Sequence, residues 1–101
     1  MTKLVHVMVS GRVQGVSYRA WCVGQAEQLG LDGWVRNRSD GAVEAVFSGP
    51  ASRVDAAVEA CRIGPPAARV DDVRLIEPGG STRATAGPMA QGAGFRILAT
   101  L

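Results

Sequence analysis

The sequence contains a single histidine and only two cysteines, too few for most of the side-chain clusters that bind metal ions in proteins. Cys22 and Cys61 lack Cys-x-x-Cys spacing and have no histidine nearby, which argues against a zinc site. We expect both to be free, buried thiols. His6 alternates with apolar residues of a predicted strand, so we expect it on the surface. The sequence therefore predicts neither a metal nor a cofactor.

Long apolar runs are also missing. None approaches the roughly 20 residues that a membrane span needs. The N-terminal segment alternates, and Gly11-Arg12 interrupts it too early for a signal peptide. We therefore expect no membrane association and a cytoplasmic location. The formal net charge of +2 is too small to indicate nucleic-acid binding, which we do not expect.

What the sequence does contain is an alternation of predicted strands and helices. A helix is predicted over 18–29 with Gly30 as its C-terminal cap, and a second over 52–63 with Ser52 as its N-terminal cap. Residues 79–94 are rich in Gly, Pro, Ser and Ala and are expected to form a flexible loop. Alternating or apolar segments predict strands at 4–10, 31–37, 42–48 and 69–77, and a last short strand at 95–98.

This order predicts one α+β domain over residues 1–101. The arrangement is a ferredoxin-like β-α-β-β-α-β sandwich, with two helices on one face of a mainly antiparallel sheet and a short extra C-terminal strand. Its first two strands run parallel, with the third inserted between them. Residues 11–19 are therefore expected close to residues 36–38. The fold alone indicates no function.

The loop before the first helix has features that suit anion binding. Gly11 and Gly15 let the backbone bend so that successive N–H groups point inward. The loop leads into a helix N-terminus, whose partial positive charge favours an anion. Arg19 lies in the first helical turn, where its guanidinium can bind two phosphate oxygens. Taken alone this pattern is common, and it lacks the Gly-Lys-Ser/Thr of the Walker A loop.

Two motifs together carry a resemblance to a known family. GRVQGVSYR at residues 11–19 resembles the acylphosphatase signature G-x-V-Q-G-V-x-[FY]-R, and GWVRN at 33–37 resembles the second motif of that family, G-[WY]-V-x-N. Position 17 departs from the pattern, because glycine is more usual there than serine. The resemblance covers roughly residues 3–78. It implies that the substrate phosphate is bound by the loop residues Gly11, Val13, Gln14, Gly15, Val16, Ser17, Tyr18 and Arg19.

The resemblance also implies the activity. Acylphosphatases hydrolyse the carboxyl-phosphate anhydride of small acyl phosphates without a cofactor, and Asn37 matches the residue that orients the attacking water. Arg36 and Arg38 either attract anionic substrates or are surface charges of a hairpin. No long apolar surface stripe requires a partner, so we expect a monomer.

Three alternatives remain open at this point. Ferredoxin-like sheets often bind RNA, although the aromatic-rich strand motif of such proteins is missing. A regulatory domain that binds a small anion without turnover would use the same loop, although it would not need Asn37. Similar domains also begin the larger hydrogenase-maturation carbamoyltransferases, and 101 residues leave no room for their other domains.

Overall fold

The computed structural model describes residues 2–76 and 94–100. Their secondary structure follows the predicted order closely, and the first helix has the predicted bounds. The elements are β1 (Thr2–Arg12), α1 (Tyr18–Leu29), β2 (Asp32–Asn37), β3 (Val43–Pro50), α2 (Ala51–Ile63), β4 (Arg69–Ile76) and β5 (Phe95–Ile97). The loop predicted over 79–94 lies outside the described residues.

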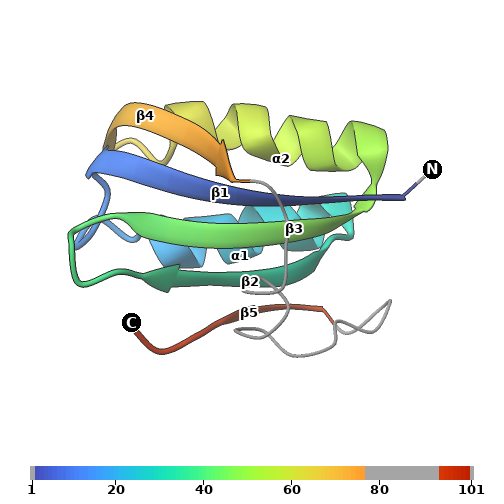
Figure 1. The fold of residues 1–101 in the computed structure, drawn as a ribbon, viewed down its shortest axis with the longest axis horizontal. Helices are drawn as coiled ribbons and strands as arrows, with labels where there is room; N and C mark the ends of the chain where they lie inside the picture. Colours follow the sequence, from blue (N-terminus) through green and yellow to red (C-terminus); the bar gives the residue numbers. More distant parts are fainter. Residues whose placement is uncertain (1, 77–93, 101) are drawn as a thin grey trace.

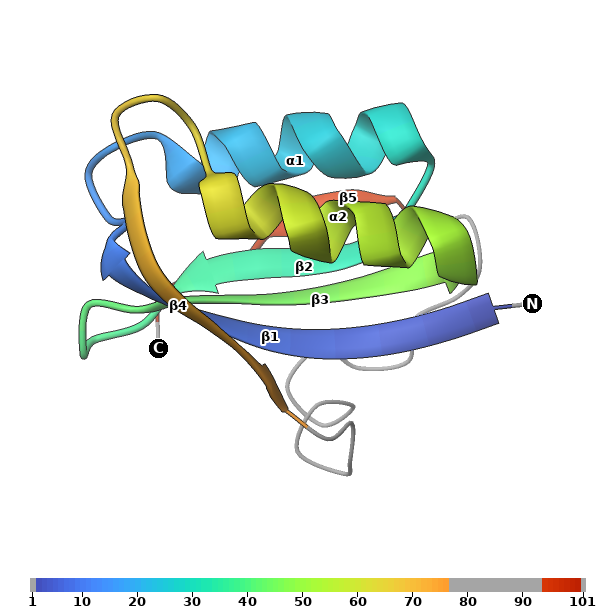
Figure 2. The same cartoon turned by 90° about the horizontal axis from the view of Figure 1, so that it is seen from above.

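Five strands form one sheet in the order β4-β1-β3-β2-β5 (Figure 1). Because β3 is antiparallel to both β1 and β2, these two strands run parallel on either side of it, as predicted. β5 adds a parallel edge strand next to β2. Both helices cover the same face of the sheet (Figure 2). The ferredoxin-like α+β arrangement is confirmed.

The hydrophobic core lies between the helices and the sheet. Alternate strand residues point into it, and each helix contributes one apolar stripe, which follows from the periods of strands and helices. The strands contribute Val7, Val9, Val35, Val43, Ala45, Phe47 and Val73, and the helices contribute Cys22, Ala26, Val54, Ala57, Val58 and Cys61. Both cysteines are free and buried, as predicted.

The helix ends agree with the sequence at one position and differ at another. Gly30 adopts φ 66° after α1, and its N–H donates to the carbonyl oxygens of Ala26 and Glu27, which confirms the predicted cap. The cap predicted at Ser52 is wrong. Helix α2 begins one residue earlier, after Pro50, and no side chain caps it. The φ of Pro50, −57°, already suits a helix start, so Ser52 lies inside the first turn.

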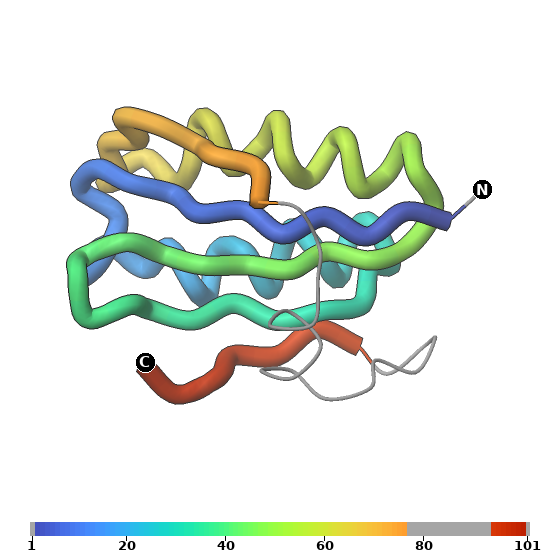
Figure 3. The backbone as a smooth tube through the Cα atoms, in the orientation of Figure 1, coloured from blue at the N-terminus to red at the C-terminus, as the bar shows by residue number. Residues whose placement is uncertain are grey.

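The topology brings the two sequence motifs together. The β1–α1 loop and the β2–β3 turn lie at the same end of the sheet, although they are distant in sequence (Figure 3). Their contact is direct, because the side chain of Gln14 in the loop reaches the backbone of the turn. The expected proximity of residues 11–19 to residues 36–38 is therefore confirmed.

Candidate active site

A cavity of about 420 Å³ opens beside the N-terminus of α1. Its wall combines the loop, the first helical turn, the end of β2 and the edge strand β5. The lining residues are Val13, Gly15, Ser17, Tyr18, Arg19, Ala20, Asn37 and Ile97. Six of the residues proposed from the sequence thus share one wall, whereas Gly11, Gln14 and Val16 do not line it.

The loop backbone contains two left-handed residues, a feature of turns that bind anions. Gly15 and Ser17 both adopt left-handed conformations, with φ of 73° and 64°. Left-handed residues in a tight turn direct successive backbone N–H groups to one side, where they can bind an anion. Ser17 is the only described residue other than glycine with a positive φ. This explains why glycine suits position 17, since a side chain is strained there.

Arg19 is the second residue of α1 and is partly exposed on the cavity wall. None of the ion pairs among the described residues includes it. Its charge adds to the positive end of the helix dipole. The guanidinium therefore has donors available for an anion in the cavity.

Asn37 ends β2 and faces the helices, because side chains alternate along a strand and Val35 lies on that face. Its Oδ1 atom is buried and has no hydrogen-bond partner within the described part of the chain. Buried polar atoms are nearly always hydrogen-bonded. Asn37 also lines the cavity, so its side-chain amide is suited to bind a water molecule or a polar ligand atom there.

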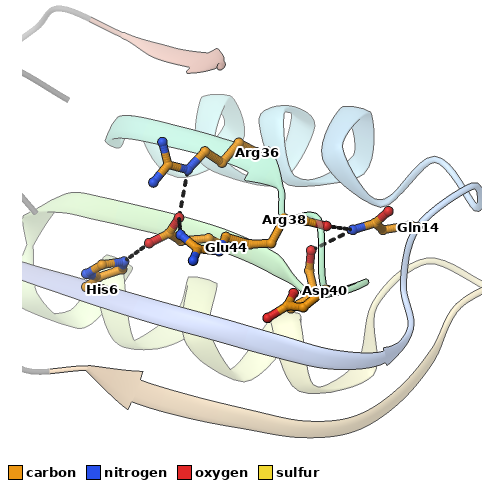
Figure 4. Close-up of polar contacts among 7 residues, drawn as sticks. His6, Gln14, Arg36, Arg38, Asp40 and Glu44 are labelled. Atoms are coloured by element: carbon orange, nitrogen blue, oxygen red, sulfur yellow. Dashed lines mark hydrogen bonds and ion pairs between the residues drawn. The ribbon is translucent and has the colours of Figure 1, made fainter. Parts of the chain in front are cut away.

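The side chain of Gln14 extends toward the β2–β3 turn (Figure 4), and Gln14 is not among the residues that line the cavity. Its Nε2 donates to the carbonyl oxygens of Arg38 and Ala42, at 2.7 and 2.8 Å. The family resemblance implied only that Gln14 belongs to the loop that binds the phosphate. No local pattern could have shown that its side chain joins the loop to a turn more than twenty residues away.

Gly11 and Val16 do not line the cavity, and their surroundings indicate roles in the fold. Gly11 lies within β1 at a register shift against β4, with φ 124°. A Cβ atom there would lie 2.2 Å from the carbonyl oxygen of Arg69, so only glycine allows this approach. Val16 is partly buried and packs against the core.

Tyr18 contributes to the cavity wall from the core side. Its hydroxyl donates to the carbonyl oxygen of Cys61 at 2.7 Å, and burial followed by the neighbouring Cys61 thiol raises the pKa of Tyr18. The phenol therefore stays protonated and is not an acid–base group. The hydrogen bond to Cys61, with burial, raises the pKa of the Cys22 thiol, which excludes it as a nucleophile.

On the opposite face of the sheet, the positions of His6 and Arg36 differ from those expected from the sequence. His6 is only 6% exposed, and its Nε2 lies 2.6 Å from Oε2 of Glu44, so it is not a surface residue. Arg36 is equally buried, and its Nε donates to Oε1 of Glu44 at 2.7 Å. Arg38 reaches the same oxygen at 3.3 Å (Figure 4). We call these four residues the Glu44 cluster.

The position of the Glu44 cluster explains both errors. The strand pattern marks only one face of the sheet as apolar, and it does not show that Glu44 supplies a partner for cations on the other face. Burial acts to raise the pKa of Glu44, but hydrogen bonds from Arg36 and His6 outweigh it and hold this pKa below its usual value. Arg36 is therefore neither a surface charge nor available to attract substrate.

Comparison with known proteins agrees with this geometry. The sequence pattern of the acylphosphatase family matches residues 5–85, most of the chain. The chain belongs to the acylphosphatase family. An acylphosphatase from Rhodospirillum rubrum is 60% identical over 73 residues, which are 72% of this chain and 80% of that protein. One from Azorhizobium caulinodans is 48% identical over 101 residues and the full length of both chains.

A solved structure extends the similarity to three dimensions. An acylphosphatase from Coxiella burnetii superposes with a TM-score of 0.79 at 34% identity, covering 96% of this chain and 93% of that one. Curated acylphosphatases are hydrolases that act on acid anhydrides, so the predicted family and enzyme class are confirmed. No helix within residues 2–76 and 94–100 is long and apolar enough to cross a membrane.

Two residues that line the cavity of this acylphosphatase-family chain were not predicted from its sequence. Ala20 follows Arg19 in α1, and Ile97 pairs with Val35 in register, next to Asn37 on the same face. A signal for Ala20 existed, since it follows the loop directly. The sequence offered no signal for Ile97, because its position at the cavity depends on the parallel pairing of β5 with β2.

Proposed function

We propose that this protein hydrolyses the carboxyl-phosphate anhydride bond of small acyl phosphates to a carboxylate and inorganic phosphate. One observation carries the proposal: the loop, Arg19 and Asn37 share the wall of a single cavity, and Oδ1 of Asn37 is buried without a hydrogen-bond partner among the described residues. A site that only bound an anion would need the first two but no buried acceptor beside them. Membership of the acylphosphatase family supports the same reaction.

The phosphate is proposed to bind between the loop and Arg19. Backbone N–H groups of residues 13–18 and the N-terminus of α1 surround its oxygens, and the Arg19 guanidinium binds two of them. Phosphoryl transfer passes through a loose transition state with its charge on the equatorial oxygens. Fixed donors around these oxygens stabilise that charge without reorganising.

Asn37 is proposed to hold the attacking water in line with the bond that breaks. The water oxygen forms a bond to phosphorus while the bond from phosphorus to the acyl oxygen breaks, and the electron pair leaves with the carboxylate. An amide is not a base at neutral pH, so a phosphate oxygen of the substrate accepts the proton of the water. The leaving carboxylate has a pKa of about 4, so it departs without a general acid.

We further propose that the enzyme works without a metal ion, as a monomer in the cytoplasm. The reacting group is the same in every acyl phosphate, so the reaction requires only that the phosphate and the water be held. The described residues contain no group of three or more His, Cys, Asp or Glu side chains that could hold a metal ion. Activity in the presence of a chelator tests directly whether the enzyme needs a metal ion.

The test is hydrolysis of benzoyl phosphate by the purified protein in excess EDTA. Wild type should turn over, and Arg19→Ala should lose at least about 3 kcal/mol of transition-state stabilisation, which is roughly 100-fold or more in rate. Arg62→Ala is the matched control, because Arg62 is exposed on α2 and pairs only with Glu59 among the described residues. Folded wild-type protein without activity would contradict the proposal and favour a regulatory anion-binding domain.

A further inference from the structure

We propose that the side chain of Gln14 is a positioning residue, which sets the distance between the phosphate loop and Asn37. This inference rests on the proposed function, because it assigns the residue that aligns the two halves of that site. Gln14 lies in the loop but does not line the cavity. It therefore acts through Asn37 and not by touching the substrate with its side chain.

The two hydrogen bonds of Gln14 end one residue beyond the Asn37–Val43 pair, one on each strand of the β2–β3 hairpin. Arg38, whose carbonyl oxygen accepts the 2.7 Å bond, follows Asn37 directly in the chain. Ala42, which accepts the 2.8 Å bond, directly precedes Val43, the residue paired with Asn37 across the β2–β3 ladder. A single amide nitrogen thus fixes Asn37 along its own strand and from the neighbouring strand.

The turn does not need Gln14 for its own structure. The N–H of Arg38 donates to Ala42 at 2.8 Å, and the N–H of Gly41 donates to Arg38 at 3.1 Å, so both carbonyl oxygens already have partners. The side chain of Asp40 also accepts from the N–H of Ala42 at 3.0 Å. Carbonyl oxygens have two lone pairs, and Gln14 uses the second of each. Its contribution is therefore the link between loop and turn.

The proposed chemistry requires this link. The loop and Arg19 hold the phosphorus from α1, whereas Asn37 holds the water from β2. An error of about 1 Å between two such groups can slow a reaction about 100-fold. Without Gln14, the two motifs would be joined by the sheet, by way of β1 and β3, and by the packing of α1 against β2. Glutamine suits the role because its amide nitrogen carries two donors.

The experiment is a double-mutant cycle with Gln14→Met, which keeps the length of the side chain and removes both donors. In the wild-type background we expect kcat to fall about tenfold, while KM and inhibition by inorganic phosphate change less than about twofold. In an Asn37→Ala background the same change should have almost no effect on kcat, because nothing remains to be positioned. Gln28→Met is the control, since Gln28 is exposed on α1.

Equal losses of kcat in both backgrounds would overturn the inference, because they would show that Gln14 acts independently of Asn37. A parallel loss of phosphate affinity would do the same, since it would assign Gln14 to building the loop. A readout without turnover separates this inference from the proposed function. The side-chain amide signals of Asn37 in ¹⁵N NMR should shift or broaden in Gln14→Met and stay unchanged in Gln28→Met. Unchanged signals in both would overturn the positioning role even if the enzyme proved inactive.

Discussion

The cavity beside α1 and the Glu44 cluster on the opposite face of the sheet both contain arginine, in very different surroundings. Arg36 and Arg38 share one oxygen of Glu44, at 2.7 and 3.3 Å. Arg19 has no carboxylate partner within the described residues and sits at the positive end of a helix. Arg36 and Arg38 donate hydrogen bonds to the buried carboxylate of Glu44, whereas Arg19 remains able to bind an added anion.

Two consecutive residues of β2, Arg36 and Asn37, belong to the two different regions. Because side chains alternate along β2, Arg36 points to the Glu44 cluster while Asn37 points to the cavity. The sheet thus separates the Glu44 cluster from Arg19 and Asn37. A structural arginine thus differs from a proposed substrate ligand in whether it has a carboxylate partner, and not in residue type.

The largest effect is expected on the structural side, from Glu44→Ala. Removing this carboxylate leaves Arg36 and His6 buried without it, and breaking a buried ion pair in this way costs about 3–5 kcal/mol of stability. Chemical denaturation measures the change in the free energy of unfolding. Glu59→Ala, which removes an exposed pair with Arg62, should change stability by less than about 1 kcal/mol. Similar changes in the two variants would refute the distinction.

On the cavity side, Asn37→Ala should reduce kcat about 100-fold with little change in KM, because the residue is proposed to orient water and not to bind phosphate. Steady-state kinetics with benzoyl phosphate measures both constants. Stability should change far less than in Glu44→Ala. An increase in KM at constant kcat would contradict the proposed role.

Arg19→Lys should have a smaller effect, about a tenfold loss of kcat/KM. Lysine keeps the charge but loses the planar pair of donors, and one charge-assisted hydrogen bond contributes about 1.5 kcal/mol. The same kinetic assay measures it, with Arg62→Lys as the control on exposed helix surface. If Arg19→Lys were as inactive as Arg19→Ala, geometry and not charge would dominate.

The pH dependence of stability follows from the lowered pKa of Glu44. A carboxyl group whose pKa is lower in the folded protein stabilises it fully above the unfolded value, which is about 4.3 for glutamate. That stability is lost as the pH falls below this value, through the pKa of the folded state. Urea unfolding between pH 7 and pH 3 should therefore show a steeper decline for wild type than for Glu44→Gln. Parallel curves would contradict the assignment.

The smallest expected effect belongs to the loop, from Ser17→Gly. Ser17 holds φ 64°, where a side chain costs about 1–2 kcal/mol, and glycine removes that strain while adding entropy to the unfolded chain. The net gain in the free energy of unfolding should be up to about 1 kcal/mol. Thermal or chemical denaturation measures it. A loss of stability would mean that the serine hydroxyl contributes more than the strain costs.

Much of the fold could be predicted from the sequence, because helices and strands are local patterns. The bounds of α1 and its glycine cap follow from side-chain periodicity and backbone preference. Ser52 was the exception, since Pro50 starts α2 without a side-chain cap. Six of the nine site residues proposed from the motifs line the cavity, so the motifs also located the candidate site.

The element order, the two motifs and the family could be recognised from the sequence, because they depend on residue type and spacing along the chain. The tertiary structure decided which charges have partners, and it placed His6 and Arg36 on Glu44 through strand register. It also placed Ile97 on the cavity wall through the pairing of β5 with β2. These features depend on contacts between distant segments, and no local pattern encodes the register that creates them.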